Sequence, residues 1–383
     1  MKTTPSFKTF GTGFQDLFAF ADGRPVETRA DWAERRKELR AILERECYGA
    51  SPAPPCQRPR LTLIKPAAPY PGGEEGDCCH MSQYIARPFA DSDFGLALDI
   101  YAPQTAAKLP AVICGDGCWL RVTPEHAALA ASRGYALVVF NRCAAVQDYM
   151  NENAFRPAGD PARDAPCDPP PRDTPIHQRN PGKDFGAVSA WAWGFSRAMD
   201  ALELLPQIDP ARVAVCGHSR GGKAALLAGA FDSRFAATIA NGSGTGGAGS
   251  LLFQDKGAEP LVTIVRAFPT WFNARLAAHA GREDVLPFDS HFLMALCAPR
   301  PLLCSDALSD AWANPAGAAL ALSEARKAYR RLDCPDWFAA SHFRNGGHGH
   351  LRGDWTAMFD YLDCVLFSKP IPWNPLWSPF GLS

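Results

Sequence analysis

A serine flanked by glycines offers the clearest chemistry in this chain. Ser219 lies within GHSRG at 217–221, a G-x-S-x-G pattern that follows the apolar run ARVAV and precedes small helix-forming residues at 220–231. Between a strand and a helix, such a serine occupies a sharp, strained turn that exposes its hydroxyl, and the flanking glycines remove side chains that would clash. The pattern predicts that Ser219 is a nucleophile; the alternative is a plain glycine-rich turn.

A serine nucleophile needs a histidine to accept its proton. In this motif's fold the chain order is serine, then acid, then histidine, so the base is expected downstream. HFRNGGHGH at 342–350 is glycine-rich and follows the last predicted strand. We select His348 as the base, with His350 and His342 as alternatives.

The same logic requires a carboxylate that orients the histidine. SDALSDAWANP at 305–315 follows a predicted strand and contains two aspartates before Pro315, which can open a helix. Asp310 is our choice and Asp306 the fallback. Either aspartate could instead cap that helix.

Two cations follow the serine. Arg220 and Lys223 lie in the first turn of the predicted helix, where the helix dipole disfavours positive charge by up to about 1 kcal/mol each. Their placement indicates that negative charge arrives nearby, either as the oxyanion of an acyl transfer or as a carboxylate. The alternative is that both side chains extend into solvent.

The glycine-rich run at 241–249 lacks the Lys-Ser/Thr of a phosphate-binding loop, so it does not predict a phosphate site.

Strand and helix patterns alternate from residue 109 onward. A doubly wound, mostly parallel α/β sheet with helices on both faces, the α/β-hydrolase fold, explains this rhythm. Upstream, Asp31 is the candidate cap of a helix, and residues 61–103 suggest an antiparallel meander. The predicted strands are 109–115, 135–141, 211–217, 235–241, 300–306 and 336–341, and the predicted helices are 124–134, 186–205, 220–231 and 315–332.

We predict one catalytic domain over residues 1–383. The segment 149–183 breaks the alternation with many prolines and is interpreted as an insertion near the rim of the active site. Thirteen cysteines match no zinc pattern, and the vicinal Cys78 and Cys79 cannot easily pair with each other. We expect mostly buried thiols, with disulfides only if the protein is exported. Neither a metal nor an organic cofactor is expected.

Charge and hydropathy exclude several classes of partner. Lys plus Arg number 39 and Asp plus Glu number 40, so no footprint for nucleic acid or an anionic membrane surface is present. No apolar stretch approaches the ~18 residues of a membrane span, and MKTTPSFKTF lacks the apolar core of a signal peptide. We expect a cytoplasmic monomer acting on a small-molecule or oligosaccharide substrate; removal of a leader would instead imply a secreted or periplasmic protein.

With these residues, the sequence resembles the glucuronoyl esterases of carbohydrate esterase family 15, which cleave esters between glucuronate branches of xylan and alcohols of lignin. The matching strings run from RRKELRAILERECYG to HFRNGGHGHL. S-R-x-G-K at 219–223, D-x-W at 310–312 and R-x-G-x-H at 344–348 separate this family from general esterases.

The resemblance implies roles for individual residues. Ser219 would be the nucleophile and His348 the base. Arg220 would support the oxyanion hole through its backbone N–H and its side chain. Lys223 would bind sugar hydroxyls.

The resemblance also assigns the sugar site. Trp312 would line it, and Glu259, more loosely aligned, would bond a hydroxyl from the opposite wall. Many members, especially fungal ones, place the acid just after the strand that matches FAATIAN, but residues 241–243 here read NGS. The acid then comes from the later loop, as in some bacterial members, and Asp310 is the matching residue.

The predicted function is therefore a serine esterase of the 4-O-methyl-glucuronoyl methylesterase type. It would hydrolyse glucuronic acid esters of the glucuronoxylan–lignin type through a Ser-His-Asp triad and an acyl-enzyme. Two alternatives stay open: an esterase of other specificity, such as an acetyl xylan esterase, and a catalytically weak carbohydrate-binding homologue.

Overall fold

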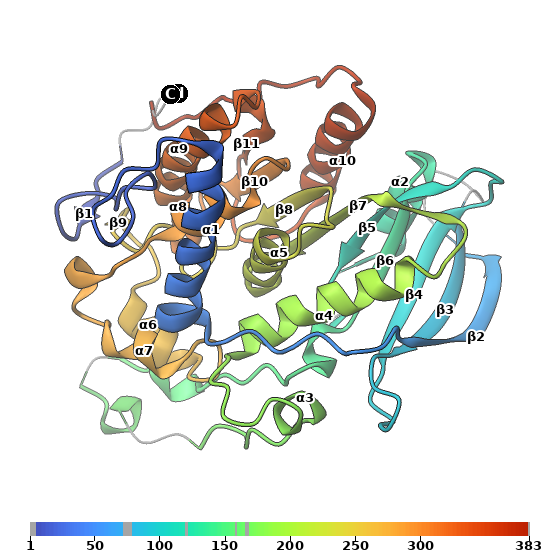
Figure 1. Ribbon diagram of the computed structural model, residues 1–383, viewed down its shortest axis with the longest axis horizontal. Coiled ribbons are helices and arrows are strands. Elements are labelled where there is room, and N and C mark those ends of the chain that lie inside the picture. The colour runs from blue at the N-terminus through green and yellow to red at the C-terminus, as the bar shows by residue number, and fades with distance from the viewer. Residues whose placement is uncertain (1–4, 72–78, 119–121, 158, 165–167, 382–383) are drawn as a thin grey trace.

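A twisted central sheet organises the molecule (Figure 1). The computed structural model describes residues 5–71, 79–118, 122–157, 159–164 and 168–381. Within them the strands are β1 (Lys8–Thr9), β2 (Arg60–Pro69), β3 (Cys79–Arg87), β4 (Leu96–Pro103), β5 (Leu109–Cys114), β6 (Ala136–Phe140), β7 (Ile208–His218), β8 (Ala237–Asn241), β9 (Phe253–Gln254), β10 (Leu302–Ala307) and β11 (Ala339–Arg344).

Nine of these strands form one sheet in the order β11-β10-β8-β7-β5-β6-β4-β3-β2, while β1 and β9 pair separately. Every pair from β11 to β6 is parallel, and β4, β3 and β2 add antiparallel strands at one edge. Each central strand is apolar and buried along all or much of its length, as expected where both faces of a sheet are covered. The predicted meander and the predicted strands are confirmed, except that the last strand is displaced: β11 spans Ala339–Arg344 rather than 336–341, and Asp336–Phe338 form a short 3-10 helix before it.

Helices cover both faces of the sheet. They are α1 (Arg29–Leu43), α2 (Pro124–Ser132), α3 (Pro175–Gln178), α4 (Ala187–Leu202), α5 (Arg220–Phe231), α6 (Leu261–Ala267), α7 (Ala274–Ala278), α8 (Ser290–Cys297), α9 (Pro315–Arg331) and α10 (Arg352–Phe367). One buried cluster contains residues of α1, α4, α5, α8 and α9, and a second contains residues of α2 and α10. Figure 1 shows α4 and α5 lying across one face. The doubly wound prediction is thus confirmed.

The start of α1 corrects one prediction. Thr28, not Asp31, caps this helix: the Thr28 side chain accepts from the N–H of Asp31, and the Asp31 carboxylate accepts from the N–H of Thr28. This reciprocal pair is a capping box with the acid at the third helical position. The helix therefore begins two residues earlier than Asp31.

The proline-rich segment 149–183 contains short helices rather than only extended chain. They span Glu152–Phe155, Pro161–Asp164 and Pro175–Gln178. The segment is anchored to its surroundings, because the N–H of Asn151 donates to the carbonyl of Ala267 at 2.7 Å.

The cysteines of the described segments are all free thiols, and most of them are buried or half-buried. Cys78 lies outside the described residues. None of the helices described here is long and apolar enough to cross a membrane.

Candidate active site

Ser219 occupies the turn between β7 and α5 in a strained backbone conformation. Its φ is +57° and its ψ is −123°, and its N–H donates to the carbonyl of Asn241 at 2.8 Å. Glycines make the turn feasible: a Cβ on Gly217 would lie 2.2 Å from the carbonyl oxygen of Gly221, and one on Gly221 would lie 2.0 Å from Oδ1 of Asp116. The strain is therefore imposed by close packing around the serine.

Two short contacts join the serine to a histidine and an aspartate. His348 Nε2 lies 3.0 Å from Ser219 Oγ, and His348 Nδ1 lies 2.6 Å from Asp310 Oδ2. The three residues follow β7, β10 and β11, which are parallel strands whose carboxyl ends meet at the same edge of the sheet. Asp310 is buried and His348 is part-exposed, so the histidine is the accessible member of the pair.

Arg344 holds the loop that carries the histidine. Its Nε binds both carboxylate oxygens of Asp354, at 2.9 and 2.7 Å, and its Nη2 donates to the carbonyls of Gly347 and Gly349 at 3.1 and 2.6 Å. These bonds flank His348 on both sides. The glycine-rich loop is thus fixed by a guanidinium rather than by regular structure.

A column of rings lies behind His348. The ring centroid of His218 is 4.5 Å from that of His348 and 5.6 Å from that of His350, which in turn stacks on Trp355 at 4.7 Å. Nδ1 of His218 lies 2.6 Å from Oδ1 of Asn241, which fixes the orientation of the first ring. The packing limits rotation of His348 away from Ser219.

The other candidates from the sequence lie in different surroundings. His342 Nδ1 lies 3.2 Å from Ser305 Oγ, and His350 belongs to the ring column. Asp306 is buried, and its Oδ1 has no hydrogen-bond partner within the described part of the chain. Burial, with Asp310 nearby, raises the pKa of Asp306 to about 8. The geometry therefore joins Ser219 to His348 and Asp310 rather than to these alternatives.

Arg220 already has a counter-charge, which corrects the simple dipole argument. Its Nη1 donates to Oδ2 of Asp148 at 3.0 Å, and its guanidinium lies 5.0 and 4.8 Å from the ring centroids of Phe268 and Trp271. The indole N–H of Trp271 donates to the other carboxylate oxygen of Asp148, also at 3.0 Å. Asp148 therefore already offsets the positive charge of Arg220 at the start of α5, so the position of Arg220 does not by itself require a bound anion.

The ion pair continues to the serine turn. Arg142 Nη2 lies 3.8 Å from Asp148, and Nη1 of the same guanidinium hydrogen-bonds to Asp116. Asp116 Oδ2 accepts the N–H of His218 at 2.8 Å. Carboxylates and guanidiniums thus alternate from the serine turn to Arg220. Asp116, Arg142 and Asp148 are buried, and Arg220 is partly exposed.

Lys223 is buried and does not extend into solvent. Its Nζ donates to the carbonyls of Ser243 and Thr245 at 2.5 and 2.6 Å, and burial lowers its pKa to about 8. Glu259 is its main electrostatic partner. Burial raises the pKa of Glu259, whose backbone N–H donates to the carbonyl of Trp312 at 3.0 Å.

These groups converge on a cavity of about 240 Å³. Six of the seven residues selected from the sequence line it, and Asp310 lies behind His348. The lining residues are Met150, Phe155, Ser219, Arg220, Lys223, Gly242, Ser243, Gly244, Glu259, Phe268, Trp271, Trp312, Ala313 and His348.

Sequence reasoning missed the second layer of this site. Asp116, Arg142 and Asp148 were not selected, nor was Trp271. Asp116 lies just after β5, and Arg142 lies just after β6. Residues just past the carboxyl ends of buried parallel strands often belong to a binding site, and this position is the signal that could have identified both.

The arrangement can carry out acyl transfer. A serine hydroxyl within hydrogen-bond reach of an imidazole can be deprotonated as it attacks a carbonyl carbon. Arg220 begins α5, where backbone N–H groups have no intrahelical acceptor and can face a developing oxyanion.

Comparisons with known proteins agree with this chemistry. The profile of a family described as "Glucuronyl esterase, fungi" matches residues 179–333. A 4-O-methyl-glucuronoyl methylesterase from Wolfiporia cocos is 31% identical over 347 residues, which cover 88% of this chain and 75% of that protein. A carbohydrate esterase from an unidentified prokaryote is 42% identical over 193 residues, or 47% of this chain and 44% of the relative.

A solved structure extends the likeness to three dimensions. The glucuronoyl esterase of carbohydrate esterase family 15 from Caldicellulosiruptor kristjansonii is 27% identical, with a TM-score of 0.74 over 97% of this chain and 95% of that one. The fold is that of the α/β-hydrolases. The chain belongs to the glucuronoyl esterase family, a family of carboxylic ester hydrolases.

Proposed function

We propose that this protein hydrolyses esters of glucuronic acid through a triad of Ser219, His348 and Asp310. The observation that carries the proposal is the pair of contacts of 3.0 and 2.6 Å that links the three side chains in the order serine, histidine, aspartate. We further propose that residues 1–383 act as one catalytic unit and as a monomer, because all three side chains come from one chain.

The reaction proceeds in two halves. Ser219 Oγ attacks the C6 carbonyl carbon of the uronate while His348 Nε2 takes the hydroxyl proton, and the imidazolium then protonates the departing alcohol. Water, deprotonated by the same imidazole, attacks the acyl-enzyme and releases the uronic acid. Asp310 orients the ring and stabilises its cation. This mechanism calls for no metal or organic cofactor.

Arg220 stabilises the oxyanion in both halves. Its backbone N–H and its side chain donate to the oxygen that becomes negative in the tetrahedral intermediate. The stacking rings of Phe268 and Trp271 and the bond to Asp148 hold the guanidinium before substrate arrives. Preorganised donors of this kind need little rearrangement during the reaction.

The opposite wall of the cavity binds the sugar. Lys223 and Glu259 present a buried cation and a carboxylate to ring hydroxyls, and Trp312, with 44% of its surface exposed, offers a ring face at the rim. Relatives of this chain are named 4-O-methyl-glucuronoyl methylesterases, which matches a uronate in this pocket.

The alcohol side of the ester lies against an apolar rim. Met150 and Phe155 line the cavity and keep 42% and 49% of their surfaces exposed. Exposed apolar side chains beside a reactive serine suit an aromatic alcohol of the lignin type. Phe155→Ala is expected to raise KM for a benzyl ester more than KM for a methyl ester.

The deciding experiment compares benzyl glucuronate with p-nitrophenyl acetate. We expect turnover of the uronate ester by the wild type and a loss of about ten-thousandfold or more in Ser219→Ala. Fast acetate release without uronate turnover would identify an acetyl esterase instead. Binding of glucuronate without any turnover would favour the carbohydrate-binding alternative.

A further inference from the structure

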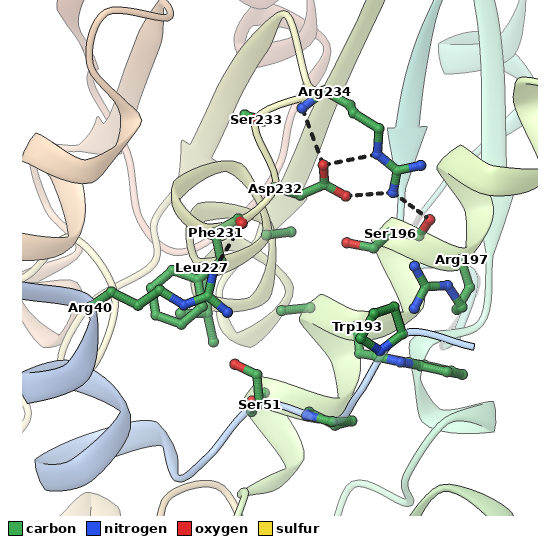
Figure 2. A pocket seen from close by; sticks show the side chains of 15 residues that line it. Arg40, Ser51, Trp193, Ser196, Arg197, Leu227, Phe231, Asp232, Ser233 and Arg234 are labelled. Atoms are coloured by element: carbon green, nitrogen blue, oxygen red, sulfur yellow. Dashed lines mark hydrogen bonds and ion pairs between the residues drawn. The ribbon is translucent and has the colours of Figure 1, made fainter. Parts of the chain in front are cut away.

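A second cavity, of about 320 Å³, lies at the far end of α5 (Figure 2). The C-terminal residues of α5 line it together with one face of α4 and the segment that contains Ser51 and Pro54. Ser219 precedes the first residue of this 12-residue helix, so the helix separates the two cavities by about 18 Å. The second cavity is therefore distinct from the proposed active site.

The face of α4 that borders the cavity is unusually polar for a buried surface. Among the residues that border the cavity are Ser189, Trp193, Ser196 and Arg197: the first, second and fourth are four residues apart, and Ser196 follows Trp193 by three, so all lie on one helix face. Ser189 is 2% exposed and Arg197 is 5% exposed. Polar groups buried to this degree normally have partners.

Arg197 uses only part of its hydrogen-bonding capacity. Its Nε donates to Oδ2 of Asp200 at 2.6 Å, and its guanidinium lies 5.0 Å from the ring centroid of Trp193. Its two terminal nitrogens have no acceptor among the residues that the structure describes, and the hydroxyl of Ser189 has no partner among them either. Figure 2 shows the guanidinium of Arg197 directed toward the middle of the cavity.

The other two guanidiniums at the cavity are already committed. Arg40 donates to Glu44 and to the carbonyl of Phe231. Arg234 binds Asp232 and Asp200, and Glu203 lies 3.2 Å from it. Among the arginines of the described residues that line this cavity, only Arg197 therefore offers open donors.

The surroundings carry no excess of positive charge. Three guanidiniums face four carboxylates, those of Glu44, Asp200, Glu203 and Asp232. The carbonyl end of α5 adds partial negative charge at the same place. An anionic ligand would meet this negative charge, so the cavity favours a neutral ligand that presents acceptor oxygens.

Part of the cavity wall is apolar. Pro52, Pro54, Leu227 and Phe231 supply carbon surface to it, and Figure 2 shows Leu227 and Phe231 across the cavity from Arg197. A ligand that fits needs neighbouring oxygens on one side and C–H groups on the other. A pyranose ring has this pattern, because equatorial hydroxyls project from its edge and C–H bonds cover its faces.

We propose that this cavity binds a neutral pyranose unit of a polysaccharide. Two adjacent hydroxyl oxygens accept from the terminal nitrogens of Arg197, Ser189 bonds a third oxygen, and the carbon face packs on the prolines and Phe231. The site would anchor the carbohydrate chain away from the reacting ester. It does not depend on the proposed esterase function, because no residue of the active site takes part.

Two tryptophans make the test specific to each cavity. The indole N–H of Trp193 donates to the carbonyl of Ala53 at 3.0 Å beside the second cavity, and Trp312 lines the first. Their ¹⁵N indole resonances, assigned with Trp193→Phe and Trp312→Phe, are followed while xylotetraose is titrated into the full chain carrying Ser219→Ala. We expect the Trp193 resonance to shift with saturation.

Variants of the cavity complete the experiment. Ala192→Phe fills the cavity from α4. We expect it to raise the xylotetraose dissociation constant, measured from the Trp193 resonance, at least tenfold, and we expect Ser189→Ala to raise it severalfold. On the otherwise wild-type chain, kcat/KM for benzyl glucuronate should stay unchanged in both variants, and thermal unfolding should confirm that both fold.

Three results would overturn the proposal. They are a Trp193 resonance that does not move, a shift that persists unchanged in Ala192→Phe, and a shift produced equally by sodium sulfate, which would show an anion site. Failure of the esterase proposal would appear separately, as absent ester turnover in the wild type.

Discussion

Asp148 and Arg220 form an ion pair with 3.0 Å between Oδ2 and Nη1, although 72 residues separate them in the chain. The carboxylate is 5% exposed and the guanidinium 18%, so solvent screens the pair only weakly. Asp148 also accepts the indole N–H of Trp271, and the ring of Trp271 lies against the same guanidinium. Two contacts therefore fix the direction of the Arg220 side chain: its ion pair with Asp148 and its packing against the ring of Trp271. These two partners are also hydrogen-bonded to each other.

Asp148→Asn should therefore lower kcat with little change in KM. The amide retains an acceptor for Trp271 but loses the charge that holds Arg220, and we expect a loss of about ten- to a hundredfold, less than removal of a direct oxyanion donor costs. Steady-state kinetics on a soluble uronate ester provide the measurement. Arg220→Met supplies the control background, because Asp148→Asn should have no further effect there; additive losses would contradict a role through Arg220.

Replacement of Asp306 should change how stability depends on pH. Because burial raises its pKa to about 8, the folded protein holds a proton that the unfolded chain releases near pH 4. The wild-type free energy of unfolding therefore falls as pH rises from about 4 to 8, by up to about 1.4 kcal/mol per pH unit from this group. Asp306→Asn removes that slope.

Chemical denaturation at several pH values between 4 and 8 tests this expectation. Activity provides a second readout: since Asp306 does not contact His348, Asp306→Asn should retain most of its turnover, whereas Asp310→Asn should lose about ten-thousandfold. The reverse pattern would assign the acid to Asp306.

The sequence predicted the strands and most of the large helices because apolar blocks and turn residues mark them locally. It did not predict α8 or α10. Residues of α8 are buried all round, so no polar face distinguishes the helix from a strand. The Asp148–Arg220 pair could not be predicted either, because it joins a loop to the first residue of α5, and only the sheet topology brings these two segments together. Asp310 and His348, whose side chains the structure brings into contact, could be selected from the sequence because the expected order of serine, acid and histidine restricts the choice.

We expect that position 242 can supply the acid of the proposed triad in place of Asp310. Gly242 has φ +51°, and a Cβ built there would lie 3.7 Å from Oδ2 of Asp310, with nothing closer than 3.5 Å. A glutamate side chain at 242 can thus bring its carboxylate to the place beside His348 that Asp310 fills. The left-handed backbone costs a non-glycine residue about 1 kcal/mol.

Gly242→Glu in an Asp310→Asn background should therefore recover at least tenfold in kcat relative to Asp310→Asn alone. The comparison needs both proteins folded, which their melting temperatures establish. Gly242→Gln in the same background is the matched control, because it adds the same bulk without the charge; equal recovery by the amide would refute the exchange of acids.

Lys223 should make substrate affinity depend on pH. Because its pKa is about 8, the ammonium loses its proton as pH rises through that value, and KM for the uronate ester should increase above pH 8. Glu259 raises the pKa of Lys223, so Glu259→Gln should move the increase to lower pH. Initial rates corrected for spontaneous hydrolysis, at pH 6 to 9, provide the measurement. A KM that stays constant over this range would show that the charge of Lys223 does not contribute to binding.

β11, the strand that leads to His348, is an edge strand. β11 pairs with β10 on one side, and on the other Ser341 bonds residues 375 and 377 near the end of the chain, with its N–H donating to the carbonyl of Pro375 at 2.9 Å. Edges supported in this way open locally before the interior of a sheet does. Heat should consequently inactivate the enzyme below its melting temperature, while Ser219 still lies in an intact core. Cooling from that temperature interval should restore activity without refolding of the whole chain.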